Sequence, residues 1–168
     1  MIKSLFRERR RSSAIRKLGL LEMPTDAVFK RFVDAAASAF KAPISMLSVI
    51  HDQEQWFKAA HGFEINCIAR TDGFCTFALD RSGVLECSDP LGDDRFARLP
   101  SVVGEPHIRY YIGAPLRLLS GVDVGVLCVI DTVTRQPASA DQKAYLQGLA
   151  RQASMALEAR LDIWGSAA

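Results

Sequence analysis

The stretch ECSDPLGDDRF at residues 86–96 holds the densest group of side chains that could do chemistry, because three aspartates precede Arg95. A calcium loop of the EF-hand type needs a glycine at its sixth position and a bidentate glutamate at its twelfth, and this stretch has neither. The spacing instead predicts a turn at Asp89, and an N-cap at Asp93 for a short helix over residues 94–99. A small-molecule contact is the alternative interpretation, and a metal site is the least favoured one.

The cysteines and histidines form no recognised metal motif. The four cysteines lack a C-x-x-C pair, and the three histidines lack an H-x-x-H or H-E-x-x-H arrangement. Cys75, in DGFCTFAL, lies between a glycine and an apolar helical stretch, where a helix N-terminus would lower the pKa of its thiol. The alternative for Cys75 is a small buried apolar side chain, and Cys128, inside an apolar strand, is predicted to be core. The sequence therefore predicts no metal site and leaves any cofactor unknown.

The motifs of the common enzyme classes are also missing from the sequence. It contains no G-x-S-x-G elbow, no phosphate-binding P-loop and no dinucleotide fingerprint. Those chemistries need such glycine-rich turns, because the turn presents the nucleophile or the backbone amides that hold a phosphate. We therefore predict a protein that is not an enzyme, with thiol redox chemistry at Cys75 as the enzymatic alternative.

The composition predicts one soluble domain. The chain has 168 residues, of which 49% are hydrophobic and 24% are charged, so it is long enough to bury a core. The longest apolar run, VGVLCVI at residues 124–130, has the length of a strand and is too short to cross a bilayer. The basic start of the chain is not followed by the apolar segment of a secretory signal, so we expect a cytoplasmic protein.

Positive charge is concentrated at the N-terminus. Residues 1–17 hold seven of the 21 basic residues and one of the 19 acidic ones, which leaves 14 bases and 18 acids in residues 18–168. We interpret residues 1–17 as a basic tail or helical extension and residues 18–168 as the folded domain. Contact with nucleic acid or anionic lipid is an alternative role for the tail. Nucleic-acid binding is not favoured, because no aromatic residues are interleaved with the basic ones.

Hydrophobic periodicity predicts helices at both ends of the domain and strands between them. Apolar residues at three- and four-residue spacing predict a first helix, which starts at Thr25 and ends before Pro43. The apolar stripe of that helix comprises Val28 or Phe29, Phe32, Val33, Ala36, Ala37 and Phe40. β-Branched and apolar runs predict one hairpin over residues 44–52 and 55–62, a short strand over 83–88, and a second hairpin over 110–132.

The last helix is predicted to begin near Ser139, a good N-cap residue, and to carry more apolar surface than one packed face needs. Its apolar positions are Leu146, Leu149 or Ala150, Ala153, Ala156 or Leu157, Leu161 and Trp164. We therefore expect a homodimer formed through a partner helix, and the alternative is that the sheet buries all of this surface. The segments between the strands are irregular and contain no long crossover helices, which predicts an α+β fold with a mostly antiparallel sheet. At Pro115 we expect a bulge or a position without a ladder hydrogen bond.

Several motifs in this order closely resemble the GAF domain family of bacterial signalling proteins. They are QWFKAAHG, the FC pair, the D-x-x-x-D-x-R-F spacing and YYIGAPL…G…LCVID, and the agreement in order and spacing covers residues 14–161. The resemblance implies an antiparallel sheet of about six strands, with the N- and C-terminal helices on one face. Loops and short helices would cover the other face, and a small molecule would bind beneath that cover.

The resemblance also implies a role and a set of site residues. GAF domains commonly dimerise through their terminal helices and signal to an output domain, so we expect this chain to act on a partner protein in trans. The candidate ligand-binding residues are Phe74, Cys75 and Phe77 from the first covering segment, Asp89, Arg95, Phe96 and Val103 from the second, and Arg109, Tyr110, Tyr111 and Pro115 from the strand beneath.

Among these residues, Arg95 and Arg109 would hold an anionic group, and Tyr110 or Tyr111 would stack on a flat ligand. The alternative is that the cover only packs on the sheet, with Arg95 paired to a nearby aspartate. The N-K…F…D-E pattern of cyclic-nucleotide-binding members and the bilin-attachment motif of phytochromes are absent. Free methionine sulfoxide reductases have clustered cysteines, of which only Cys75 has a counterpart here. We therefore expect a sensory or regulatory domain with an unidentified ligand; the alternatives are a redox role for Cys75 and a pure dimerisation module.

Overall fold

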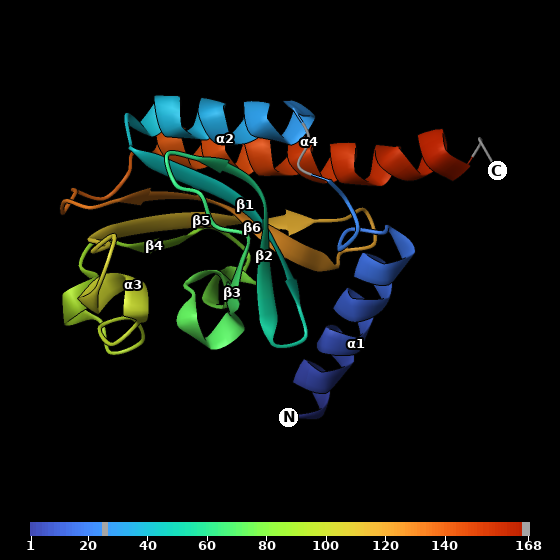
Figure 1. The fold of residues 1–168 in the computed structure, drawn as a ribbon, viewed down its shortest axis with the longest axis horizontal. Helices are drawn as coiled ribbons and strands as arrows, with labels where there is room; N and C mark the ends of the chain where they lie inside the picture. The colour runs from blue at the N-terminus through green and yellow to red at the C-terminus, as the bar shows by residue number, and fades with distance from the viewer. Residues whose placement is uncertain (25–26, 166–168) are drawn as a thin grey trace.

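The protein is a six-stranded antiparallel sheet with two helices on one face and a cover of short segments on the other (Figure 1). The computed structural model describes residues 1–24 and 27–165, and it describes side chains as far as residue 160. The strand order is β3-β2-β1-β6-β5-β4. The predicted α+β architecture is therefore confirmed.

The strands are β1 (Ile44–His51), β2 (Glu54–His61), β3 (Cys67–Ala69), β4 (Leu85–Cys87), β5 (Tyr110–Arg117) and β6 (Asp123–Asp131). The helices are α1 (Ile2–Lys17), α2 (Ala27–Phe40), α3 (Pro100–Val103) and α4 (Ala140–Gly165), and the short 3-10 segments are η1 (Arg70–Asp72), η2 (Cys75–Ala78) and η3 (Pro90–Gly92). Both predicted hairpins are confirmed, as β1–β2 and β5–β6. The three-residue strand β3 was not predicted, because it is too short to show alternation.

Alternation along the central strands divides the core into two layers. On β1, Leu47 and Val49 face the helices, whereas Met46 and Ile50 face the cover. Successive side chains of a strand point to opposite faces, so a strand that is covered on both sides must be apolar throughout. This requirement explains the nearly continuous apolar sequence of β6.

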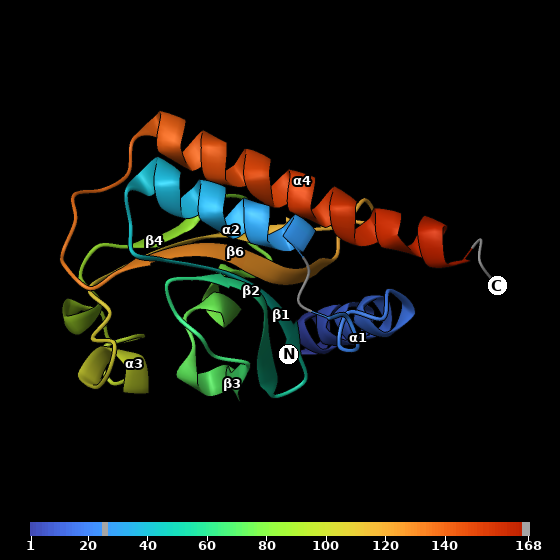
Figure 2. The same cartoon turned by 45° about the horizontal axis from the view of Figure 1, so that its top comes forward.

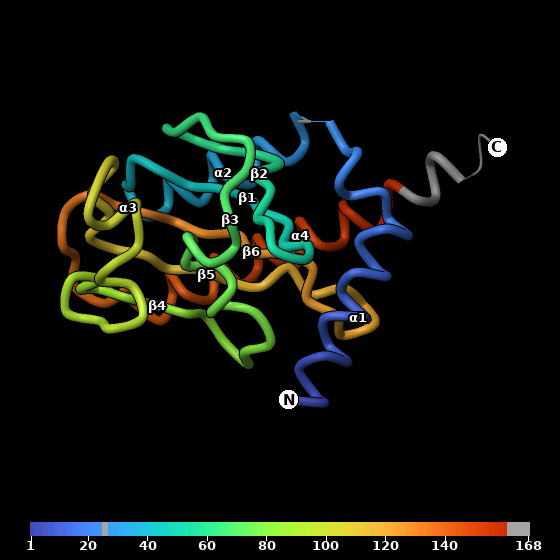
Figure 3. Tube along the Cα trace, turned by 60° about the horizontal axis from the view of Figure 1, so that its bottom comes forward, coloured from blue at the N-terminus to red at the C-terminus, as the bar shows by residue number. Residues whose placement is uncertain are grey.

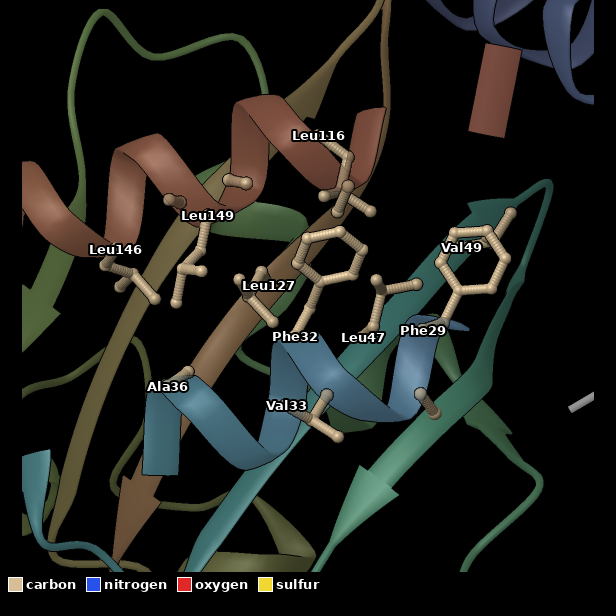
Figure 4. Packing of buried hydrophobic residues seen from close by; sticks show 14 of the residues in the cluster. Phe29, Phe32, Val33, Ala36, Leu47, Val49, Leu116, Leu127, Leu146 and Leu149 are labelled. Carbon is tan, nitrogen blue, oxygen red and sulfur yellow. The ribbon is translucent and has the colours of Figure 1, made fainter. Parts of the chain in front are cut away.

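Helices α2 and α4 lie side by side over one face of the sheet (Figure 2). The predicted stripe of α2 is confirmed, because Phe29, Phe32, Val33, Ala36, Ala37 and Phe40 are all buried. Figure 4 shows Phe32 reaching between α2 and α4 toward Leu127 on β6. The predicted helix start at Thr25 lies outside the described residues.

Helix α4 begins where the sequence predicted it. Ser139 Oγ accepts a hydrogen bond from the Gln142 backbone N–H at 3.1 Å, and Gln142 Oε1 accepts one from the Ser139 N–H at 3.0 Å. This reciprocal pair is a capping box, which satisfies two backbone donors at the helix start. The predicted apolar positions Leu146, Leu149, Ala150, Ala153 and Leu157 are buried against the sheet and α2, and the side chains of Leu161 and Trp164 lie outside the described residues.

The helix expected after Asp93 needs correction, and at Pro115 only the expected bulge does, because a proline has no N–H to give to the ladder. The helix expected over residues 94–99 is a series of turns, in which the Asp93 carboxylate accepts from the backbone N–H of Arg95 at 3.0 Å. This bond is the one that the predicted N-cap makes, and the Asp93 carbonyl accepts from the Ala97 N–H at 2.8 Å, but the turn does not continue as a helix because Leu99, which precedes a proline, is extended. Pro115 pairs with Val126 within the ladder, and the register shift lies between the two residues that follow Pro115.

Residues 2–17 form α1, which lies beside the sheet, away from α2 and α4 (Figure 1). The inner face of α1 is not solvated, because Arg11 is 1% exposed and Ile15 is fully buried. The outer face exposes Ile2, Leu5 and Phe6 together with most of the basic side chains. The polar contacts of Arg11 with the cover segment are described below.

Candidate functional site

A cavity of about 210 Å³ lies between the sheet and its cover. The antiparallel register builds its floor, because Met46 pairs with Cys128 and Ile44 pairs with Ile130, so these four side chains share one face. Figure 3 shows η1, η2 and the α3 region in front of this face of the sheet. The lining is mostly apolar and consists of Ile44, Met46, Gln55, Phe57, Phe63, Ile65, Ile68, Asp72, Gly73, Phe74, Cys75, Pro100, Ser101, Glu105, Pro106, Ile108, Tyr111, Cys128 and Ile130.

A stack of aromatic rings forms one wall of the cavity. Phe74 lies between Tyr111 and Phe96, with ring centroids 4.8 Å and 4.5 Å apart, and both pairs are stacked. Phe77 meets the ring of Phe96 edge-on at 5.2 Å. Each such pair contributes about 0.5–1.5 kcal/mol beyond the burial of its area, so the stack fixes the η2 segment on β5.

Two buried thiols and a tyrosine lie together in the cavity wall. The Tyr111 hydroxyl donates to Cys75 Sγ at 3.2 Å, and the thiols of Cys75 and Cys128 both line the cavity and influence each other's pKa. The hydrogen bond from Cys128, supported by others from Tyr111, Ser48 and Gln55, lowers the pKa of Cys75. The bond to Cys75 and burial raise the pKa of Cys128, and burial raises that of Tyr111 well above its ordinary value.

Gln55 places an unpaired polar atom at this cavity. Its side chain is 2% exposed, and its Oε1 is the one buried side-chain oxygen or nitrogen in the described residues that has no hydrogen-bond partner. The same side chain is one of the groups that lower the pKa of Cys75. Gly73 gives the carbonyl its space, because a Cβ at position 73 would lie 2.3 Å from Oε1. A buried acceptor without a donor is costly, and a ligand with a donor would remove that cost.

Three of the predicted site residues, Phe74, Cys75 and Tyr111, line this cavity together. Phe96 is fully buried behind Phe74, and Phe77 is 40% exposed at the outer edge of the aromatic stack. Neither Phe96 nor Phe77 belongs to the lining, so they support the wall from behind.

The residues predicted from the second covering segment lie away from the cavity. Arg95 binds Asp93 through two hydrogen bonds, Nε–Oδ1 at 3.0 Å and Nη2–Oδ2 at 2.7 Å, which is the pairing that the sequence left as an alternative. Asp89 accepts from the backbone N–H of Gly92 at 3.3 Å and so forms the predicted turn. The Val103 side chain is 63% exposed.

The residues predicted from β5 and its start are divided between the two faces. Arg109 donates to the carbonyls of Val102 and Ile108, each at 2.9 Å, and thereby holds the chain between α3 and β5. Tyr110 points to the helix face, where its hydroxyl donates to Glu86 Oε2 at 2.6 Å; burial and this carboxylate raise its pKa. Pro115 lines a separate surface pocket beside Arg117 and α4.

Several lining residues did not appear in the sequence-based prediction, and Gln55 is the most informative of them. The lining also includes Phe57, Phe63, Ile65, Pro106 and Ile108, which come from β2 and from two loops. A signal for Gln55 was present, because it is the cover-facing polar residue in the strand sequence EQWFKAAH. The loop residues carried no periodic signal.

A polar network ties the cavity cover to α1. Glu8 binds Arg70 at the start of η1 through two contacts of 2.8 Å, and Arg11 binds Asp80 beyond η2 at 2.9 Å. Arg11 also pairs with Glu8 and donates to the Asp123 carbonyl at 2.7 Å. The bond from Arg70 lowers the pKa of Glu8 to about 2, against desolvation. The segment 70–80, which carries Phe74 and Cys75, is therefore attached to α1 near both of its ends.

The part of the chain that the structure describes offers neither a membrane-spanning helix nor a metal-binding cluster. None of its helices is both long and apolar enough to cross a membrane. No three His, Cys, Asp or Glu side chains gather there in a way that could hold a metal ion.

Comparisons with known proteins identify relatives of this fold. A model of the GAF domain family matches residues 24–157. A cyclic di-GMP phosphodiesterase from Pseudomonas aeruginosa is 42% identical over 144 residues, which are 86% of this chain and 24% of that protein. This chain thus spans about a quarter of the length of that relative.

Solved structures share the fold at low sequence identity. The GAF domain of an Acinetobacter phosphoenolpyruvate-protein phosphotransferase has a TM-score of 0.65 and 16% identity, over 96% of each chain. The type II free methionine-R-sulfoxide reductase of Thermoplasma acidophilum has a TM-score of 0.64 and 15% identity, over 78% of this chain and 90% of that one.

Proposed function

The chain belongs to the GAF domain family, a sensory and regulatory fold, and from this membership we propose that it binds a small molecule in the cavity beneath its cover. The observation that carries the proposal is the cavity of about 210 Å³ with the unpaired Gln55 carbonyl in its wall. Concave, mostly apolar pockets with a few oriented polar groups are the usual form of a small-molecule site.

The regulated process that we propose is the hydrolysis of cyclic di-GMP. Support comes from the Pseudomonas relative, whose name describes this activity and whose matching segment corresponds to the present domain. The domain would be the regulatory input to such a phosphodiesterase, either as a separate partner in trans or on the same polypeptide. The four free cysteines of the chain favour a reducing compartment, and we propose the cytoplasm.

The route of the signal that we propose runs from the cavity to α1. A ligand that contacts Phe74 and Cys75 would move the segment 70–80, and this segment is attached to α1 through the Arg70–Glu8 and Arg11–Asp80 pairs. Packed elements with two discrete arrangements are the physical means by which sites influence each other. Helix α4 on the opposite face would provide the contact with a second copy.

Replacing the matching segment of the Pseudomonas phosphodiesterase by this chain tests the proposal. We expect the hybrid to hydrolyse cyclic di-GMP at a rate that changes when Ile65→Trp fills the cavity. Val133→Trp, at an exposed position outside the cavity, is the matched control and should leave the rate unchanged. An active hybrid whose rate is the same with and without Ile65→Trp would contradict the regulatory role.

The buried thiols favour a second candidate function, a peroxide sensor. Cys75 and Cys128 both line the cavity, and Tyr111 donates to Cys75, so a peroxide that enters the cavity would meet two thiols. Hydrogen peroxide would be reduced to two waters while the two thiols lose two hydrogens and form a disulfide. Intact-protein mass spectrometry after peroxide treatment should then show this loss in the wild type and in Cys67→Ser, but not in Cys75→Ser. Unchanged masses at equal peroxide would exclude this candidate.

A further inference from the structure

We infer that the ligand of this cavity is a compact, uncharged ring compound with an N–H or O–H group that donates a hydrogen bond to Gln55 Oε1. This inference rests on the proposed function and specifies its ligand class. Size is the first argument, because the cavity measures about 210 Å³. An apolar cavity of about 150 Å³ holds one benzene molecule, so this one suits a single or fused ring. A cyclic dinucleotide, with two bases, two sugars and two phosphates, could place only a part of itself in this volume.

Charge is the second argument. No Lys, Arg or His side chain lines the cavity in the described part of the chain, and its two ionisable carboxylates are those of Asp72 and Glu105. The two arginines expected to hold an anion are bound elsewhere, Arg95 by Asp93 and Arg109 by backbone carbonyls. A phosphate or carboxylate would lose its hydration here without gaining a cation, so anionic ligands are disfavoured.

Hydrogen-bonding direction is the third argument. Gln55 Oε1 is buried and has no hydrogen-bond partner among the described residues, so the group left to be paired is an acceptor. A ligand that offers only acceptors would leave this oxygen unpaired, whereas a ligand with an N–H or O–H would satisfy it. The flat Phe74–Tyr111 stack forms the adjacent wall and suits an aromatic ring.

Indole and benzofuran separate the hydrogen bond to Gln55 from the fit of the ring in the cavity, because the two molecules have the same shape and only indole carries an N–H. We expect calorimetry on the intact chain to show indole binding about tenfold tighter than benzofuran, the value of one hydrogen bond. In Gln55→Leu, and in Gln55→Met as a second variant, the preference should disappear while benzofuran still binds. Gln53→Leu, at an exposed position in the turn before β2, should keep the wild-type preference.

Three outcomes would overturn the inference, and they differ in what they imply for the proposed function. Equal affinity for indole and benzofuran in the wild type would exclude the role of Gln55 as acceptor. Binding of GMP or cyclic di-GMP that is lost in Ile65→Trp would show that the ligand class is wrong and the sensory cavity is real. If indole, benzofuran, GMP and cyclic di-GMP all failed to bind the folded wild-type chain, the result would count against the ligand class and the proposed function together.

Discussion

Gln55 carries an unpaired buried carbonyl, which should lower the stability of the ligand-free protein. An unpaired buried carbonyl costs about 1–3 kcal/mol relative to an apolar group of similar shape. We therefore expect Gln55→Leu to raise the free energy of unfolding by about 1 kcal/mol. This value is at the low end of the range because the substitution also removes the contact between the amide and Cys75. Thermal unfolding should show an increase of about 2–4 °C. Gln53→Leu should change the melting temperature little, and a lower melting temperature in Gln55→Leu would contradict the unpaired state of Oε1.

Gly73 is required by the position of the Gln55 carbonyl. A Cβ at position 73 would lie 2.3 Å from Gln55 Oε1 and 3.1 Å from Ile68 Cδ1. We expect Gly73→Ala to destabilise the protein by about 1–3 kcal/mol, the usual cost of overpacking, as measured by urea unfolding. The double variant Gly73→Ala/Gln55→Ala should lose less than the sum of the two single variants, because Gln55→Ala removes the atom that clashes.

Gly148 in α4 provides the control for this substitution. A Cβ at position 148 would meet nothing within 4 Å, so Gly148→Ala should stabilise the helix by about 0.5–1 kcal/mol. Opposite signs at the two glycines would show that contact, and not backbone freedom, decides the effect at position 73. Equal effects at both would contradict this account.

Helix α1 is attached to the cavity cover by charges, and this attachment makes stability depend on pH. The pKa of Glu8 is lowered from 4.5 to about 2, mainly by the hydrogen bond from Arg70. A depressed folded-state pKa contributes stability that is present above the unfolded-state pKa and is lost as the pH falls toward the folded-state value. The Glu8 contribution should therefore be complete above about pH 4.5 and should decline between pH 4.5 and 2.

Urea unfolding of the wild type and of Glu8→Gln measures this contribution. About a third of the Glu8 side chain is exposed, so solvent screening reduces the effect to about 1–2 kcal/mol at pH 6. We expect the difference in unfolding free energy between the two proteins to shrink as the pH falls from 4.5 toward 2.5. A pH-independent difference for Glu8→Gln would show that Glu8 contributes through packing alone.

The whole molecule has one helical face and one covered face, and a partner copy is proposed for the helical face. Most apolar residues of α4 up to Leu157 are buried within the subunit, whereas Tyr145 and Met155 are 48% and 60% exposed. We expect light scattering to give a dimer mass at micromolar concentration and Met155→Glu to shift it toward the monomer. Val133→Glu, which changes an equally exposed residue outside α4, should leave the mass unchanged. A monomer mass in the wild type would contradict the dimer.

Local patterns in the sequence were sufficient to predict the main helices and strands of the fold. The α2 stripe, the two hairpins and the Ser139 cap depend on contacts within a helical turn or between neighbouring strands, and each was predicted at its place. The resemblance to the GAF family predicted the cover, and it also predicted a ligand site beneath the cover. Phe74, Cys75 and Tyr111 were selected in this way, and the structure brings them together at one cavity.

Only the tertiary structure decided which side chains meet at that cavity and which bind elsewhere. Tyr110 and Tyr111 are neighbours in sequence, but alternation sends them to opposite faces, and the sheet register decides which one faces the cover. Glu8 and Arg70 are 62 positions apart, so no local pattern could pair them. The sequence determined the elements because their signals are periodic and local. The charge and hydrogen-bonding character of the cavity depended on long-range packing, which placed Gln55 in its wall and the arginines outside it.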